Sequence, residues 1–149
     1  MGVVRTYPLR VAAEAAKTPD KICRRWLDNG VITLRGNDSK PGGSGNYIGL
    51  SRNRIVQLAA TAALLNKGVS LSCAAKAALE FSDAGNNGRA AGEVYPIGKT
   101  VLTIGGPNGP AVRNVDFNVS VFELSNDGVA IIVDLNRIAE QVDSVLNNQ

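Results

Sequence analysis

Basic side chains are the residues of this sequence best suited to binding chemistry, and they concentrate in its first third. Lys21, Arg24 and Arg25 fall within a single short segment. A guanidinium on a helix can bind phosphate or pair bidentately with guanine. Residues 1–54 hold ten Lys and Arg against four acidic residues, whereas residues 93–149 hold three against seven. The first third therefore predicts a polyanionic partner, and the last third predicts a different role.

Several classes of catalytic site are excluded by residue types that are missing or too few. The chain has no histidine, which excludes Ser-His-Asp and Cys-His catalysis. Two cysteines, Cys23 and Cys73, cannot form a zinc site of four thiolates. The segment Gly42-Gly43-Ser44-Gly45 is not followed by the Lys-Ser/Thr of a P-loop. We therefore expect a protein that is not an enzyme and that holds no cofactor or metal. One catalytic alternative stays open, a metal-dependent nuclease using Asp116, Glu123, Asp127 and Asp134.

The same inventory predicts a cytoplasmic protein. The two cysteines lie far apart and outside any CxxC pair, which favours reduced, buried thiols over a disulfide. The sequence has no long apolar run of the kind that is typical of a signal peptide or a membrane span. We expect no membrane partner, and a bacterial or phage-encoded protein associated with the nucleoid.

Two short helices joined by a tight turn are predicted at the start of the chain. Residues 9–17 are rich in apolar residues, and Thr18-Pro19 then reads as an N-cap followed by the first helical position. The second helix runs to about Asn29, and Gly30 is a natural stop. Its apolar residues share one face: Ile22, Cys23, Trp26 and Leu27.

A wing is predicted after these helices. Val31–Leu34 and Asn46–Leu50 read as short strands on either side of a glycine-rich, basic loop. Two further helices follow, one capped by Ser51 and running to about Asn66, the other capped by Ser70 and running to about Phe81.

The pattern changes after a small, polar segment at residues 83–92, which we interpret as a linker. Strands are predicted at 94–104, 111–124 and 129–133. Asp134 then caps a last helix, which packs on the sheet or on a second subunit through Leu135, Ile138, Val142 and Val145. The expected fold class is α+β. It comprises a mainly α winged helix-turn-helix at 1–82, the linker at 83–92, and a small β-rich unit with a C-terminal helix at 93–149.

An ordered set of motifs runs through residues 9–82. It starts with Ile22-x-x-x-Trp26-Leu27-x-x-Gly30-Val31-Ile32 and continues with Asn46-Tyr47, and it ends with Arg54-Ile55-x-x-Leu58 and Lys67-Gly68-Val69-Ser70-Leu71. This order resembles the winged helix-turn-helix of the MerR superfamily, including its excisionase-like relatives. The resemblance implies binding of double-stranded DNA as a dimer, with the second helix in the major groove and the wing against the backbone.

The sequence departs from that superfamily beyond the fourth helix. A Gly- and Asn-rich loop stands where MerR regulators place the helix of their dimer coiled coil, and no cysteine follows Cys73 to sense a metal. We therefore assign self-association or effector binding to residues 93–149, and whether a small-molecule effector exists stays open. The expected DNA-binding residues are Thr18, Lys21, Arg24, Arg25, Arg35, Lys40, Tyr47, Arg52 and Arg54.

These inferences lead to one expected function and two alternatives. The expected function is a sequence-specific, dimeric DNA-binding transcriptional regulator. The first alternative is a phage or mobile-element factor, of the excisionase or small-terminase kind, that uses the same module. The second is a protein-interaction adaptor whose helical module no longer contacts DNA.

Overall fold

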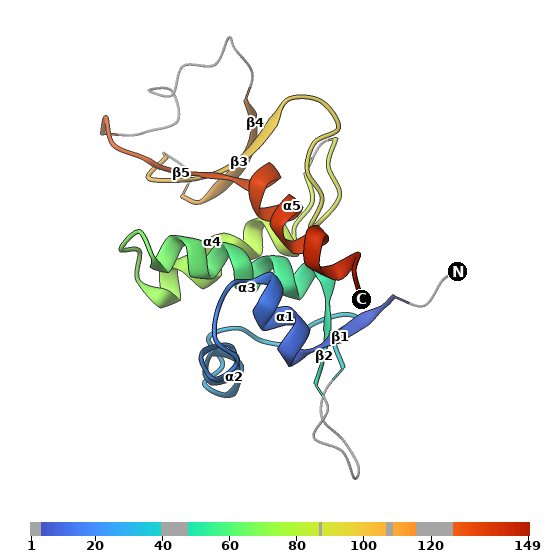
Figure 1. Ribbon diagram of the computed structural model, residues 1–149. Helices are drawn as coiled ribbons and strands as arrows, with labels where there is room; N and C mark the ends of the chain where they lie inside the picture. The colour runs from blue at the N-terminus through green and yellow to red at the C-terminus, as the bar shows by residue number, and fades with distance from the viewer. Residues whose placement is uncertain (1–3, 40–47, 87, 107–108, 116–126) are drawn as a thin grey trace.

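The computed structural model describes residues 4–39, 48–86, 88–106, 109–115 and 127–149, and it has the expected α+β class (Figure 1). Within those residues, five helices surround a shared core and two small antiparallel sheets lie at its margins. The N- and C-terminal segments lie close together, and the Arg5 Nη2 donates to the Gln149 carbonyl at 3.1 Å.

The first two helices are α1 (Leu9–Ala15) and α2 (Asp20–Asp28), joined by a tight turn. The turn closes through Lys17, whose φ of 52° is left-handed. The Lys17 and Thr18 amides donate to the Glu14 and Ala13 carbonyls, which is the usual way to end a helix on a left-handed residue. The predicted cap at Thr18 is wrong, because its hydroxyl donates back to the Ala16 carbonyl at 3.0 Å.

The strand predicted at Val31–Leu34 is also wrong. Ile32 is fully buried and its amide donates to the Trp26 carbonyl, so this segment packs beneath α2 and forms no ladder. The strand that precedes the third helix, β2 (Gly49–Ser51), pairs with β1 (Thr6–Pro8) at the start of the chain. The close pairing requires a glycine, since a Cβ on Gly49 would lie 2.8 Å from the Thr6 Oγ1.

A single bridge between Ser39 and Gly49 closes the base of the predicted wing. Residues 40–47 between them, which include the start of the second predicted wing strand, lie outside the described residues.

The two central helices begin at the predicted caps. The Ser51 hydroxyl accepts the Arg54 amide at the start of α3 (Arg52–Leu65), and the Ser70 hydroxyl accepts the Cys73 amide at the start of α4 (Leu71–Ser82). Ten of the fourteen residues of α3 are buried, which confirms the expectation that this helix is covered on more than one side.

A three-stranded antiparallel sheet follows, with the strand order β4-β3-β5. Its strands are β3 (Lys99–Ile104), β4 (Ala111–Val115) and β5 (Ile131–Asp134). The remainder of the second predicted strand, residues 116–124, lies outside the described residues. The final helix, α5 (Leu135–Leu146), begins at the predicted Asp134 cap, whose carboxylate accepts the Arg137 amide at 3.1 Å.

Helix α5 joins the two parts of the chain that the sequence suggests as separate domains. It lies between the sheet and helices α1 and α3 (Figure 1), and one hydrophobic cluster unites Leu102, Leu135 and Val142 with the core of the helical part. Apolar surface from both parts is therefore buried in one core that crosses the predicted boundary.

The predicted linker takes part in this packing. Arg89 is 7% exposed, and its guanidinium donates to the backbone carbonyls of five residues: Glu80, Phe81, Ala84, Ala90 and Glu93. Because these carbonyls lie on both sides of the turn, the arginine holds the segment against the end of α4.

Candidate nucleic-acid interface

Helix α2 separates an apolar face from a basic one. Cys23 and Trp26 are buried, whereas Lys21, Arg24 and Arg25 are exposed. None of these three cations forms a salt bridge with any other residue that the structure describes, although Asp20 and Asp28 lie at the two ends of the helix. Helix α2 therefore presents three positive charges to solvent.

The buried face fixes how α2 presents those charges. Burial, with a smaller contribution from the negative charge of Asp20, raises the pKa of Cys23 to about 11 and keeps the thiol neutral in the core. Gly30, with a φ of 74°, ends the helix as predicted, and the chain then turns beneath Trp26. The helix is thus anchored along one side, and its opposite side faces outward on the part of the molecule away from the three-stranded sheet (Figure 1).

Arg54 is among the expected DNA-binding residues, but the structure places it inside the protein. Its side chain is 1% exposed and lies between two carboxylates, with its Nε 2.9 Å from the Asp38 Oδ2 and its Nη2 2.8 Å from the Asp83 Oδ2. Its Nη1 also donates to the Gln57 Oε1 at 2.6 Å. A guanidinium whose donors are engaged inside the protein cannot reach a phosphate without breaking this network.

Arg52 is also engaged within the protein. Its Nε and Nη2 bind both oxygens of Asp143 on α5, at 2.7 and 3.1 Å, and its Nη1 donates to the Gly92 carbonyl at 2.6 Å. The hydrogen bond to Asp143 is the main reason that the pKa of Arg52 rises above its ordinary value. Arg52 joins α3 to α5, which leaves it poorly placed for the predicted phosphate contact.

Asp38 is the residue of this region that sequence reasoning missed. Its side chain is fully buried and accepts the Arg35 amide, the Ser51 amide and hydroxyl, and the Arg54 Nε, all between 2.7 and 2.9 Å. It therefore fixes the segment that carries Arg35 against the start of α3. Its one signal in the sequence is that it is the sole acidic residue between Asp28 and Glu80.

The remaining predicted residues divide into two groups. Arg35 is exposed, and its Nε makes one long contact, 3.3 Å, with the Thr33 hydroxyl, so its charge is accessible to a partner. Thr18 is half-buried in the turn before α2. Lys40 and Tyr47 lie outside the described residues. The structure thus brings Lys21, Arg24 and Arg25 together and sets Arg52 and Arg54 apart.

Two further findings bear on other kinds of site. Within the described residues, no group of three or more His, Cys, Asp or Glu side chains is arranged to hold a metal ion. Of the four acids of the nuclease alternative, Asp116 and Glu123 lie outside that part of the chain, while Asp134 is occupied by Lys99, 3.0 Å away. No helix among the described ranges is long and apolar enough to cross a membrane.

No protein-family model matches this chain, and no curated protein matches it in sequence. The site therefore rests on the geometry and charge of the residues described above.

Proposed function

We propose that this protein binds double-stranded DNA as a sequence-specific transcriptional regulator, with α2 in the major groove. The observation that carries the proposal is the basic face of α2. Three cations on nine helical residues face solvent without a salt bridge inside the described part of the protein, while the other face is buried. An exposed guanidinium can read guanine through O6 and N7, which is worth about 1–3 kcal/mol of discrimination per contact.

The dimensions of α2 suit this role. A helix with its side chains is about 10–12 Å in diameter, and the major groove is about 12 Å wide, so α2 can lie in the groove. The tight α1–α2 turn supports a helix-turn-helix arrangement of the MerR-like kind. Arg35, held by Asp38 on the segment that leaves α2, supports a phosphate contact beside the groove.

The C-terminal unit is proposed to mediate self-association, so that two copies of α2 read two half-sites. Truncating residues 93–149 does not test this idea, because Leu102, Leu135 and Val142 belong to the core shared with the helical part. The mass of the full chain in solution is the appropriate measurement. A monomer at micromolar concentration would contradict the proposed dimer.

Selection of bound fragments from random duplex DNA tests the main proposal. The wild-type chain should recover a palindromic consensus, and the Arg24→Glu/Arg25→Glu variant should lose it. Affinity for the selected site should fall by at least about 30-fold, since two contacts of about 1–3 kcal/mol each are lost. The dependence of binding on salt should also become less steep, because fewer counterions are released.

A matched control separates these contacts from net charge. The Lys76→Glu/Arg137→Glu variant changes the same total charge at exposed positions on α4 and α5. It should keep the consensus and most of the affinity. Equal losses in both variants would show a non-specific charge effect and would contradict a reading helix. Direct repeats would favour the mobile-element alternative, and no enrichment would favour the adaptor.

A further inference from the structure

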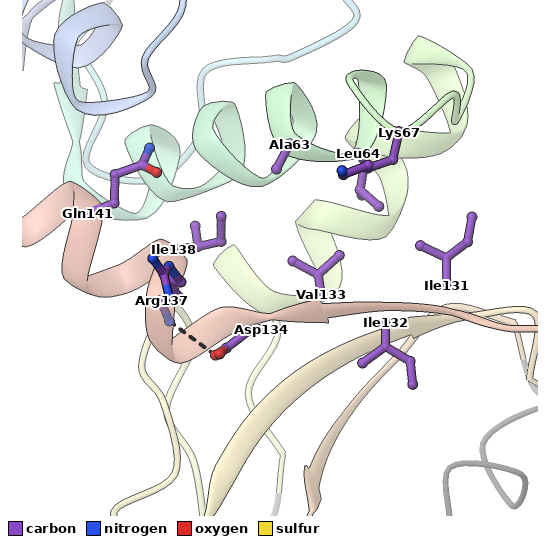
Figure 2. Close-up of a pocket in the computed structure, with 10 residues that line it drawn as sticks. All are labelled: Ala63, Leu64, Lys67, Ile131, Ile132, Val133, Asp134, Arg137, Ile138 and Gln141. Carbon is purple, nitrogen blue, oxygen red and sulfur yellow. Dashed lines mark hydrogen bonds between the residues drawn. The ribbon is translucent and has the colours of Figure 1, made fainter.

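A groove with a volume of about 320 Å³ lies between the C-terminal half of α3 and the β5–α5 junction. Ala63 and Leu64 line it from α3, and Ile131 and Val133 point toward them from β5 (Figure 2). Ile138, on the first turns of α5, closes one end. These side chains give the groove an apolar interior at a junction of three elements. Its volume is at the small end of the range for small-molecule sites.

Two cations border this apolar interior. Lys67 extends over Leu64 along one side, and Arg137 lies on α5 beside Ile138 (Figure 2). Both are exposed, and neither forms a salt bridge with any residue in the described ranges. The groove has one carboxylate, Asp134, which is already bound by the Lys99 Nζ at 3.0 Å and by the Arg137 amide at 3.1 Å. The border of the groove therefore has positive charge without a counter-charge.

We propose that this groove binds a small organic acid with a hydrophobic body. The body lies against Ala63, Ile131 and Val133, which are half-buried, and there it removes apolar surface from water. The carboxylate pairs with Arg137, whose planar guanidinium matches it bidentately, and Lys67 adds a second positive charge. This ligand chemistry uses both features of the groove. A neutral apolar compound would leave the two cations unpaired, and a purely polar anion would leave the apolar interior in water.

Gln141 connects the groove to the DNA-binding part. It lines the groove, and its Nε2 donates to the Ala15 carbonyl at the end of α1, at 2.9 Å. It also borders a second cavity beside Ala16 and Lys17, in the turn that leads into α2. An acid in the groove therefore lies one hydrogen bond away from the segment that positions α2. Amide exchange in residues 15–18 should slow when the acid binds.

Calorimetric and NMR titrations of the full chain, without DNA, test the proposal. The probes are hexanoate, 3-phenylpropionate and 1-naphthoate, each compared with its primary amide. We expect at least one acid to bind at least about tenfold more tightly than its amide and to shift the amide resonances of Ile131–Val133 and Leu64. If none of the three acids binds more tightly than its amide, the proposal is wrong.

Variants locate the binding site. Lys67→Gln/Arg137→Gln should weaken binding of the acid by at least about tenfold, while Arg10→Gln/Lys76→Gln removes two exposed cations elsewhere and should leave it unchanged. Equal binding by wild type and the groove variant would overturn the proposal. So would groove resonances that shift with protein concentration instead of with acid, since a second copy would then be the occupant. The inference goes beyond the proposed function, and the result of these titrations does not depend on whether the chain binds DNA.

Discussion

The arginines of α2 and those at the start of α3 look alike in the sequence and differ in the folded protein. Arg24 and Arg25 face solvent and form no salt bridge within the described residues. Arg52 and Arg54 are engaged by carboxylates that lie 16, 29 and 91 residues away along the chain. The comparison teaches that a basic residue on a helix is available to a partner only if no distant carboxylate reaches it first.

Replacement of Arg54 should have the largest effect on stability. Arg54→Met leaves Asp38, whose side chain is fully buried, without its cation, and breaking a buried pair costs about 3–5 kcal/mol. The free energy of unfolding, measured in urea, should fall by that amount. Arg24→Met serves as the matched control and should change the free energy of unfolding by less than about 0.5 kcal/mol.

A double variant sharpens this result. Arg54→Met/Asp38→Asn removes the fully buried carboxylate together with its cation and leaves only the more exposed Asp83 without Arg54, so the loss should be smaller than the sum of the two single losses. Similar losses in Arg54→Met and Arg24→Met would contradict the distinction between a structural arginine and an available one.

The second-largest predicted effect is a contribution of Asp83 to the free energy of unfolding that depends on pH. Burial alone would raise the pKa of Asp83, but the hydrogen bonds from Arg54 and Ser82 outweigh it and hold the pKa below its ordinary value. The ionised form is therefore favoured in the native state. The resulting stability is present above about pH 4 and is lost as the pH falls through the lowered native value.

Asp83→Asn measures this contribution. At pH 7 the variant should be less stable than wild type by about 1–2 kcal/mol, because the ion pair with Arg54 and one of its two hydrogen bonds to the carboxylate are lost. The difference should begin to shrink as the pH falls below about 4, where Asp83 becomes protonated in the unfolded chain, and it should disappear below the lowered native pKa, where Asp83 is protonated in the folded protein as well. Glu80→Gln, at an exposed carboxylate of α4, should change stability by less than about 0.5 kcal/mol at pH 7. A pH-independent difference would refute the role of the Asp83 charge.

Features that depend on neighbouring residues could be predicted from the sequence. Ser51, Ser70 and Asp134 cap helices as expected, because a cap needs only its own side chain and the amide three positions on. Gly30 and Gly68 both adopt the left-handed backbone that ends a helix. The α+β class followed from the same local patterns.

Features decided by distant partners could not be predicted. Val31–Leu34 has the composition of a strand, but burying Ile32 beneath Trp26 took precedence, and β1 became the partner of β2. The separation of Arg52 and Arg54 from the exposed cations of α2 could not be predicted for the same reason. Asp143, which binds Arg52, and Asp38, which binds Arg54, are not local neighbours of these arginines in the sequence.

The smallest effect concerns Lys17, a basic residue in the turn that leads into α2. Its left-handed φ of 52° costs a non-glycine residue about 1–2 kcal/mol, because the Cβ lies close to the following carbonyl oxygen. Substitution by glycine removes that Cβ and with it this cost. The greater freedom of glycine in the unfolded chain offsets part of that gain, so Lys17→Gly should raise the free energy of unfolding by about 0.5–1 kcal/mol. Lys76→Gly, inside α4, introduces glycine at an exposed lysine where the backbone is helical, and it should lower stability by about 1 kcal/mol. Opposite signs in urea unfolding would show that Lys17 is strained by its backbone and that its side chain, unlike that of Arg54, does not hold the fold together. Equal losses in both variants would instead place Lys17 with Arg52 and Arg54 among the basic residues that stabilise the fold.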